Sequence, residues 1–245
     1  MKSPIPWIGG KSLLKNKVID SFPPQDSYNR YIDVFGGGGS ILFAKDKHAD
    51  LEVYNDANSD LVNFFRCLKY HSNELKKEVR YYLNSREMFI NCRERISATG
   101  FTDIQRAAMF YVLVKTGFGA SLRTFGCNKK RLNTDCFEDI EARLDGVVIE
   151  NIYFEDIIKV YDRDKALFYC DPPYHTTERH YEVKFTEADH ERLCKVLHQI
   201  KGRFVLSYND DEYIRELYMD CNIQAVVRSN SLSSGEFKEV IIKNF

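Results

Sequence analysis

Short runs of β-branched and aromatic residues recur along the chain, and each ends at a polar or glycine-rich turn. Runs of this length between such turns are typical of buried strands. The predicted strands are residues 31–35, 51–54, 147–149, 166–170 and 203–208. After Asn58 or Ser59, either of which can serve as an N-cap, residues 61–68 place their apolar side chains at helical spacing. After the four glycines at 36–39, residues 41–44 can open a helix before the second strand. Strand, glycine turn, helix and strand in this order predict an α/β protein with a doubly wound, mostly parallel sheet.

The last third of the chain repeats this pattern and then changes it. Thr186 and Asp189 form a predicted capping box for a helix over 186–201. Residues 223–227 and 240–242 flank a Ser-Ser-Gly turn, which predicts an antiparallel pair of strands. The expected fold is therefore a Rossmann-like sheet that ends in two antiparallel strands.

Residues 70–145 break the alternation of strands and helices. The pattern predicts helices over 86–96 and 102–115, the second with Thr102 as its cap, followed by a glycine-bearing basic loop over 117–131. We expect an inserted helical subdomain here. Residues 1–69 and 146–245 would then form the catalytic domain on either side of it.

Composition restricts the class of protein. The 245 residues suffice for one domain with a compact insertion, and 44% hydrophobic with 29% charged residues is an ordinary globular balance. The longest uncharged apolar run, 107–114, is far below the roughly 18 residues of a membrane helix. The first residues lack the apolar core of a signal peptide. We expect a soluble cytoplasmic protein without membrane contacts.

Cysteine and histidine spacing argues against a metal site. The seven cysteines form no C-x-x-C pair, and the six histidines add no metal-binding motif. We therefore expect reduced, mostly buried thiols and no bound metal.

The net charge of -1 does not indicate nucleic-acid binding, but the local distribution of charge does. No acidic residue lies between Asp103 and Asp135. The basic residues of this stretch are Arg106, Lys115, Arg123, Lys129, Lys130 and Arg131. A local basic stretch suits contacts with backbone phosphates. The alternative is a solvated loop that is basic by chance.

The strongest chemical signal is Asp171-Pro172-Pro173-Tyr174, directly after a predicted strand. An exocyclic aromatic amine is a poor nucleophile until hydrogen-bond acceptors hold its two hydrogens. The Asp171 carboxylate and the Pro172 carbonyl can be those acceptors, in a loop that prolines make rigid. The Tyr174 ring offers a surface on which a base can stack. An ordinary strand-ending turn is the alternative, and the position after a buried strand favours function.

A glycine loop supplies the second signal. Residues 36–39 are four glycines after the first predicted strand, where a ligand can approach the backbone closely. Asp56 ends the second strand, at the place where an acid can bind ribose hydroxyls. Together they indicate an adenosine-containing cofactor, against the alternative of a plain tight turn.

The segment 7–12, Trp-Ile-Gly-Gly-Lys-Ser, ends like a phosphate-binding P-loop. That motif needs a glycine where Ile5 stands, so we reject a nucleoside triphosphatase. The segment can instead place Trp7 and Lys11 against the cofactor, or anchor the N-terminus by apolar contacts.

Taken together, these motifs resemble the α-class DNA adenine methylases. The matches to that family are its W-x-G-G-K segment at 7–11, its acid-x-F-x-G-x-G-S loop at 33–40, its D-x-N-x-D-L segment at 56–61, its D-P-P-Y signature at 171–174, and further segments at 185–186, 207–210 and 231–234. They occur in the family's order and span both ends of the chain.

The resemblance implies a Rossmann-like methyltransferase fold and direct transfer of a methyl group from S-adenosylmethionine to the N6 amino group of a flipped-out adenine in DNA, without a metal. It implies catalytic roles for Asp171, Pro172 and Tyr174. The residues that it implies for cofactor binding are Trp7, Lys11, Phe35, Gly36, Gly38, Asp56, Asp156 and Asp171.

The inserted segment departs from the best-known pattern. Relatives that methylate adenine in GATC often carry an N-G-L-x-R-x-N loop followed by F-N-V-P, whereas this chain has Gly-Phe-Gly-Ala-Ser-Leu-Arg-Thr-Phe-Gly at 117–126. That is closer to a branch found in phages and mobile elements. The location of the recognition region carries over, but its sequence preference does not. Arg123 is implied as a phosphate or base contact, and Lys129, Lys130 and Arg131 as phosphate contacts to double-stranded DNA. A subdomain that only stabilises the core is the alternative.

Other functions stay open from the residues alone. A methyltransferase of the same fold could act on RNA, on protein glutamine or on cytosine, although enzymes of the last two kinds typically carry Asn or Ser where Asp171 stands. A catalytically inactive DNA-binding relative would not need Asp171 or Asp56. We expect a monomer, although no residue pattern decides the oligomeric state.

Overall fold

The computed structural model describes the chain except residues 12, 128–131, 177–183 and 230–235. The described residues form one seven-stranded sheet in the order β3-β2-β1-β4-β5-β7-β6. The strands are β1 (Arg30–Asp33), β2 (Leu51–Asn55), β3 (Val147–Glu150), β4 (Ala166–Cys170), β5 (Arg203–Asn209), β6 (Asn222–Ser229) and β7 (Glu236–Lys243). β1 to β5 are parallel, whereas β7 runs antiparallel to β5 and β6 and lies between them. The predicted doubly wound sheet with an antiparallel C-terminal pair is confirmed.

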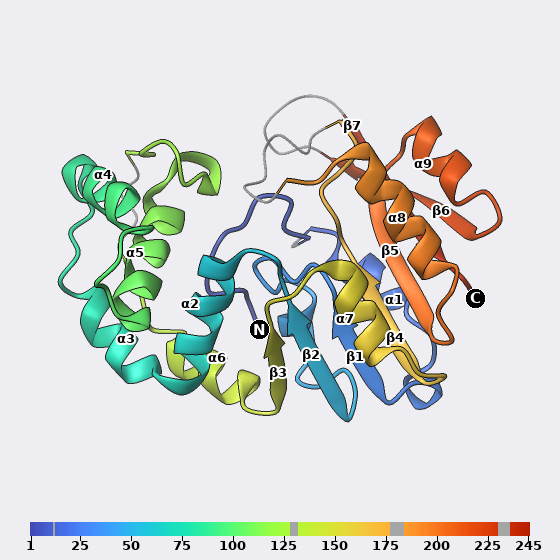
Figure 1. Ribbon diagram of the computed structural model, residues 1–245, viewed down its shortest axis with the longest axis horizontal. Coiled ribbons are helices and arrows are strands. Elements are labelled where there is room, and N and C mark those ends of the chain that lie inside the picture. Colours follow the sequence, from blue (N-terminus) through green and yellow to red (C-terminus); the bar gives the residue numbers. More distant parts are fainter. Residues whose placement is uncertain (12, 128–131, 177–183, 230–235) are drawn as a thin grey trace.

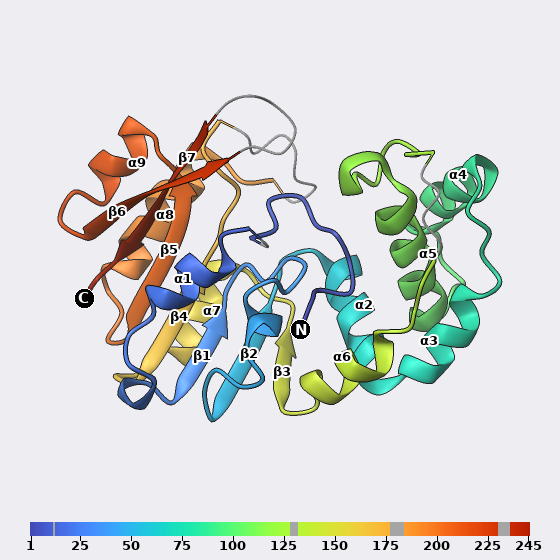
Figure 2. The same cartoon turned by 180° about the vertical axis from the view of Figure 1, so that it is seen from behind.

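Helices cover both faces of the sheet (Figures 1 and 2). One face packs against α7 (Phe154–Tyr161), α8 (Glu187–Leu197) and α9 (Glu212–Leu217), and the other against α1 (Lys15–Asp20) and α2 (Ser59–Tyr70). Alternate strand residues supply the two cores. Tyr31 and Tyr169 belong to the core beside α2, while Ile32 and Phe168 belong to the core beside α7 and α8. The sheet is thus buried on both faces, as parallel sheets require.

The segment predicted as an insertion is helical and lies beside the β3 edge (Figure 1). It comprises α3 (Ser72–Val79), α4 (Arg86–Arg95), α5 (Asp103–Thr116) and α6 (Phe137–Leu144). The predicted cap of α5 is confirmed, because Thr102 and Gln105 form a capping box. Every residue of α5 from 107 to 114 is buried, so this helix is the centre of the lobe. The division of the chain at residues 70 and 145 stays a prediction.

Other helix boundaries agree with the sequence in part. Asn58 is the N-cap of α2, since its side chain accepts hydrogen bonds from the backbone N–H groups of Asp60 and Leu61. The capping box of Thr186 and Asp189 is also present, although α8 ends at Leu197 rather than near residue 201. Among the described residues, no helix is long and apolar enough to span a membrane.

The helix expected after the glycine loop is wrong in extent. Only a 3₁₀ turn, η2 (Leu42–Ala44), forms there. Side chains from elsewhere bind the carbonyl groups that would continue it: Arg143 donates to the carbonyls of Leu42 and Lys45, and His48 bonds that of Ile41. The backbone turns extended at Lys45, with φ of -122° and ψ of 155°, and these side chains supply donors to carbonyls that a longer helix would have bonded itself.

Candidate active site

A cavity opens at the carboxyl ends of β1, β2 and β4. The strand order of the sheet reverses here, between β1 and β4. Open α/β sheets bind ligands at this place. The sequence segments that line the cavity are 7–11, 33–38, 40–41, 55–58 and 152–154, together with Tyr169, Asp171, Pro173 and Phe185. Segments far apart in the chain therefore meet at the point where the sequence predicts a site.

The glycine loop fits tightly between two aromatic side chains. A Cβ atom on Gly36 would lie 2.2 Å from the ring of Tyr54, and one on Gly37 would lie 2.8 Å from the indole of Trp7. Gly37 also has a φ of 50°, which favours glycine. The Tyr54 hydroxyl donates to the Gly37 carbonyl at 2.7 Å. Glycine is thus required by packing, and the loop backbone faces the cavity.

Asp56 holds this loop from the neighbouring strand. Its Oδ2 accepts a hydrogen bond from the backbone N–H of Gly37 at 2.9 Å, and its Oδ1 accepts one from Asn58 at 2.8 Å. Burial raises the pKa of the Asp56 carboxyl, while these backbone N–H groups lower it. Asp56 is therefore both a cavity wall and a link between the ends of β1 and β2.

Asp171 is held by two partners at the end of β4. The Lys11 ammonium lies 2.6 Å from Oδ1 and 2.7 Å from Oδ2, and Ser207 Oγ donates to Oδ1 at 2.8 Å. Lys11 itself is only 6% exposed. Burial raises the pKa of Asp171, and the charge and hydrogen bond of Lys11 oppose that rise. The carboxylate is thus fixed in orientation at the wall of the cavity.

A third carboxyl group, Asp33 at the end of β1, is buried in the same wall. Its Oδ2 accepts a hydrogen bond from the Tyr31 hydroxyl at 3.3 Å, whereas its Oδ1 has no hydrogen-bond partner among the described residues. Burial, followed by the charge of Asp171, raises its pKa well above the usual range. Three acids around one cavity, with Lys11 as the cation that lines it, suit a positively charged ligand.

A cluster of aromatic rings also lines the cavity. The rings of Phe35, Phe154 and Phe185 lie 5.7–5.9 Å apart, centroid to centroid, and all three line it. Such a cluster offers an apolar pocket for a flat ring system beside the polar wall.

The structure brings together most of the residues predicted from sequence. Those that line the cavity are Trp7, Lys11, Phe35, Gly36, Gly38, Asp56 and Asp171. Pro172 is buried beside them, and the ring centroid of Tyr174 lies 4.6 Å from the Lys11 ammonium.

Asp156 lies apart from this group. It is exposed in the first turn of α7 and does not line the cavity, whereas its neighbours 152–154 do. Its predicted cofactor contact gains no support from this position.

Two further predicted sets lie elsewhere. Arg123 is exposed in the loop after α5. Lys129, Lys130, Arg131 and the segment 231–234 lie outside the described residues.

Several cavity residues were not singled out from sequence. They are Asp33, Asn55, Phe154 and Phe185 in the wall, and Ser207 behind Asp171. Asp33 carried a signal, because an acid inside a predicted buried strand is costly unless it has a use. Phe185 and Ser207 lie in segments that match the family, but the match gave them no role. Asn55 and Phe154 gave no signal, since only the tertiary fold places them here.

Comparison with known proteins agrees with the geometry. M1.LlaDCHI, a type II methyltransferase of Lactococcus lactis subsp. cremoris, is 27% identical to this chain over 98% of the chain and 94% of its own length. The retron Ec67 DNA adenine methylase of Escherichia coli is 25% identical over 97% and 88%, and the DNA adenine methylase of Serratia marcescens 23% over 93% and 90%.

Among solved structures, a putative methylase from Haemophilus influenzae aligns with 95% of this chain and 97% of its own, at 13% identity and a TM-score of 0.40. A family model described as D12 class N6 adenine-specific DNA methyltransferase matches residues 7–231, more than nine-tenths of the chain. The protein therefore belongs to the D12 class of N6 adenine-specific DNA methyltransferases.

Proposed function

We propose that the cavity binds S-adenosylmethionine and that Asp171, Pro172 and Tyr174 hold a flipped-out adenine for methylation at N6. Membership of the family makes the chain an adenine-specific DNA methyltransferase, and methyltransferases of this kind use S-adenosylmethionine. The observation that carries the assignment of residues is the fixed carboxylate of Asp171 at the cavity wall, between Lys11 and Ser207.

The cavity suits this methyl donor in charge and shape. S-Adenosylmethionine carries a sulfonium and an α-ammonium group, and Asp33 offers a buried oxygen without a partner among the described residues. Asp56, at the end of β2, is in place to accept hydrogen bonds from ribose hydroxyls. The ring cluster of Phe35, Phe154 and Phe185 suits the adenine of the donor.

The chain's own residues prepare the acceptor amine. When bound, the donor supplies an electrophilic methyl group on a positively charged sulfur. Asp171 accepts a hydrogen bond from the amine and turns its lone pair toward the donor, while Lys11 and Ser207 keep the carboxylate in that orientation. The amine must also lose a proton. The raised pKa of Asp171 makes its carboxylate a better acceptor for that proton.

Adenine must leave the DNA stack before it reaches Asp171, at a cost of a few kcal/mol. Stacking on an aromatic ring recovers about 1–3 kcal/mol per base. Tyr174, next to Asp171 and beside Lys11, is placed for that contact.

The decisive experiment replaces Asp171. Asp171→Ala is expected to lower methyl transfer to plasmid DNA by about a hundredfold to a thousandfold, with the fold intact, because one preorganised polar group in an active site is worth about that much. Transfer is measured with labelled S-adenosylmethionine, and the modified bases are then sequenced. Asp156→Ala, an exposed acid outside the cavity, is the control and should retain activity. Full activity in Asp171→Ala would remove this mechanism. Donor binding without methylated DNA would move the substrate to RNA or protein.

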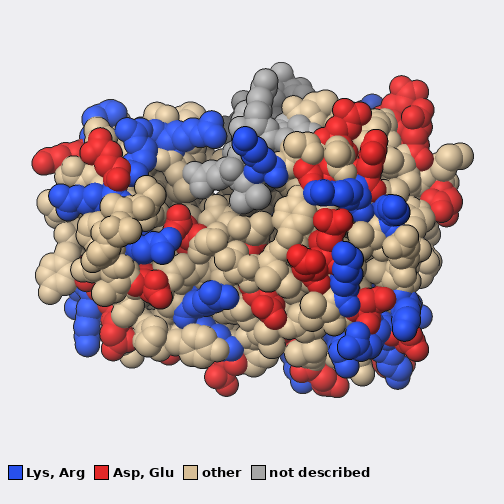
Figure 3. All heavy atoms as spheres, in the orientation of Figure 1, with Lys and Arg blue, Asp and Glu red and all other residues tan. Residues whose placement is uncertain are grey.

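The helical lobe over 70–145 is our candidate for target recognition. Arg86 lies over the ring of Phe125, and Arg93 donates to the carbonyl of Arg123, so three exposed arginines gather where α4 meets the loop after α5. Figure 3 shows Lys and Arg side chains along the upper rim of this lobe. Such a rim suits backbone phosphates.

Salt dependence tests this surface. Each phosphate contact that is removed should reduce the slope of log affinity against log salt by about 0.9. Arg123→Ala should show that reduction, and Arg30→Ala, on the far side of the sheet at the start of β1, should not. An unchanged slope in Arg123→Ala would exclude Arg123 as a phosphate contact.

A further inference from the structure

The antiparallel strand β7 brings a buried carboxyl group to the catalytic edge of the sheet. Glu239, near the start of β7, is opposite Asn209 at the end of β5, and it is only 2% exposed. Because β7 runs against β5, its amino end lies at the edge where β4 and β5 have their carboxyl ends. A residue late in the sequence thereby reaches the loop that follows β4.

Glu239 contacts the tyrosine of the catalytic loop. The Tyr174 hydroxyl donates a hydrogen bond to Glu239 Oε2 at 2.5 Å. Burial and the charges of Asp171 and Glu239 raise the pKa of the Tyr174 phenol well above its usual range, so the hydroxyl keeps the proton that it donates. This is a short bond to an ionisable acceptor, the strongest kind that a tyrosine makes.

Two other contacts restrict the orientation of the Tyr174 ring. The Lys11 ammonium lies 4.6 Å from the ring centroid, and the ring of Tyr208 packs 6.1 Å away at an angle of 38°. Lys11 also holds Asp171. The orientation of Tyr174 is thus coupled through one lysine to the carboxylate that is proposed to hold the amine.

We propose that Glu239 is a positioning residue for methyl transfer: by holding the Tyr174 hydroxyl, it fixes the ring on which the target adenine stacks. The proposal rests on the role of Tyr174 in the proposed function. A ring that is already oriented does not have to be ordered when the base arrives, and preorganisation of this kind increases the rate of the bound complex. The competing explanation is that the bond only satisfies a buried carboxyl group within the sheet.

A double-mutant cycle separates these explanations. Single-turnover methylation is measured on plasmid DNA with the wild-type enzyme, Tyr174→Phe, Glu239→Gln and the double variant. Tyr174→Phe keeps the ring and removes the bond, and should lower the rate by about tenfold, the lower end of what a bond to a charged group is worth. Glu239→Gln keeps the shape and an acceptor but removes the charge, and should lower it by about threefold to tenfold.

The coupling between the two changes decides the outcome. If Glu239 acts through Tyr174, Glu239→Gln has no further effect once Tyr174 is phenylalanine, and the dissociation constant of S-adenosylmethionine stays unchanged in all variants. Independent effects that multiply in the double variant would overturn the proposal. So would a loss that appears only in the thermal unfolding midpoint and not in the rate.

A matched pair elsewhere provides the control. Tyr161 donates to Glu150 at 2.8 Å, between α7 and β3 and away from the cavity. Tyr161→Phe and Glu150→Gln should leave the single-turnover rate unchanged.

A spectroscopic readout covers the case in which Glu239→Gln does not fold. DNA with 2-aminopurine at the target adenine should change its emission in complex with Tyr174→Phe relative to wild type, because an unanchored ring stacks differently on the base. Identical emission would overturn the proposal. If the wild-type enzyme methylated no adenine, the proposed function itself would fail. If the enzyme is active but the rate losses of the two single variants multiply in the double variant, only the positioning role of Glu239 would be rejected.

Discussion

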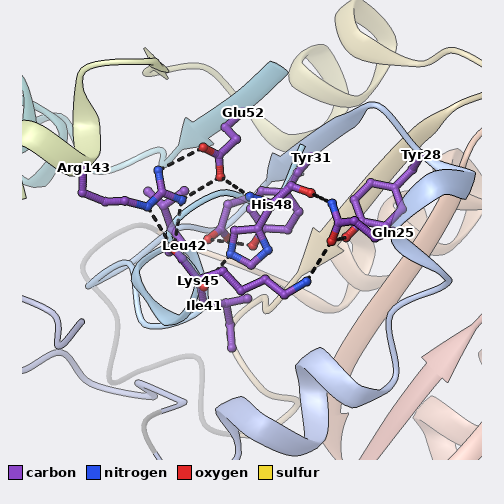
Figure 4. Close-up of polar contacts among 10 residues, drawn as sticks. Gln25, Tyr28, Tyr31, Ile41, Leu42, Lys45, His48, Glu52 and Arg143 are labelled. Carbon is purple, nitrogen blue, oxygen red and sulfur yellow. Dashed lines mark hydrogen bonds and ion pairs between the residues drawn. The ribbon is translucent and has the colours of Figure 1, made fainter. Parts of the chain in front are cut away.

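Charged side chains are buried at both ends of the sheet, but they are matched at one end and unmatched at the other. At the amino ends of the strands, Arg143 of α6 meets Glu52 of β2, and each side chain is 6% exposed (Figure 4). At the carboxyl ends, Asp33, Asp56 and Asp171 surround a cavity that Lys11 lines as their counterion. The same sheet therefore carries a matched ion pair at the amino ends of its strands and more acidic than basic groups at their carboxyl ends.

The matched end is bonded in detail. Arg143 makes two hydrogen bonds to the Glu52 carboxylate, at 2.6 and 2.9 Å, and two to the carbonyls of Leu42 and Lys45. Glu52 also accepts from the backbone N–H of His48. The comparison shows how buried charge can be interpreted. Where all partners come from the chain itself, the group stabilises the fold. Where burial and neighbouring acids raise the pKa of a carboxyl group in a cavity, as for Asp33, the group is a candidate for ligand binding.

The largest effect is expected at the matched end. Arg143→Ala leaves Glu52 buried without its cation, and breaking one partner of a buried pair costs about 3–5 kcal/mol. Urea unfolding of the enzyme measures this loss. Arg106→Ala is the control. The side chains of Arg106 and its partner Asp60 are each about one-third exposed, so this ion pair should contribute little to the free energy of unfolding. A loss below about 1 kcal/mol in Arg143→Ala would mean that the buried pair does not hold the lobe to the sheet.

The second largest expected effect is a loss of stability at low pH, and it also arises at the amino ends of the strands, where the buried charges are matched. Burial lowers the pKa of His48 from 6.5 to about 4, and its ring stacks on Tyr31 with a centroid distance of 4.2 Å. Between these pH values the unfolded chain binds a proton that the folded protein does not. Stability therefore falls as the pH drops from about 6.5 to about 4, by about 3 kcal/mol.

His48→Gln should flatten that part of the curve. Unfolding free energy is measured from pH 7 to pH 4, with His71→Gln, an exposed histidine, as the control. An unchanged acid slope in His48→Gln would show that other groups cause the loss.

The smallest expected effect is a loss of stability as the pH rises, the opposite direction to that of His48. It arises at the carboxyl ends of the strands, around the cavity. The pKa of Asp33 is raised, so above about pH 4 the folded protein holds a proton more readily than the unfolded chain, and stability falls as the pH rises. Asp33→Asn should remove this part of the slope and stabilise the free enzyme at pH 8 by about 1 kcal/mol. It should also weaken binding of S-adenosylmethionine, which calorimetry measures. Stabilisation without loss of affinity would separate Asp33 from the donor.

The sequence predicts the parts of this molecule that depend on neighbouring residues. The cap of α2, the Thr102 cap of α5 and the capping box of α8 depend on side chains within three or four positions, and they form as expected. The strands form where they are predicted, although β1 ends at Asp33 rather than at residue 35 and β7 begins at Glu236 rather than at residue 240. Asp56 and Asp171 meet as expected, because parallel strands bring their carboxyl ends to one edge.

Errors and omissions come from residues distant in sequence. The short turn at Leu42–Ala44 depends on Arg143, about one hundred positions away, which no local pattern contains. Ser207 and Glu239 reach the site only through β5 and β7. The cofactor contact that the resemblance implies for Asp156 stays a prediction, since Asp156 is exposed in α7 while residues 152–154 line the cavity.

The position of β7 between β5 and β6 has a consequence for synthesis on the ribosome. Among the described residues β6 pairs with β7 alone, so residues 222–229 have no strand to join until β7 has been translated. The pairing of β6 with β7 is local, beginning at Ser229 and Glu236, whereas β7 joins β5 across a longer separation, with Asn209 opposite Glu239. Pairings over longer separations form more slowly, so the Tyr174–Glu239 contact has to wait for the step in which β7 joins β5.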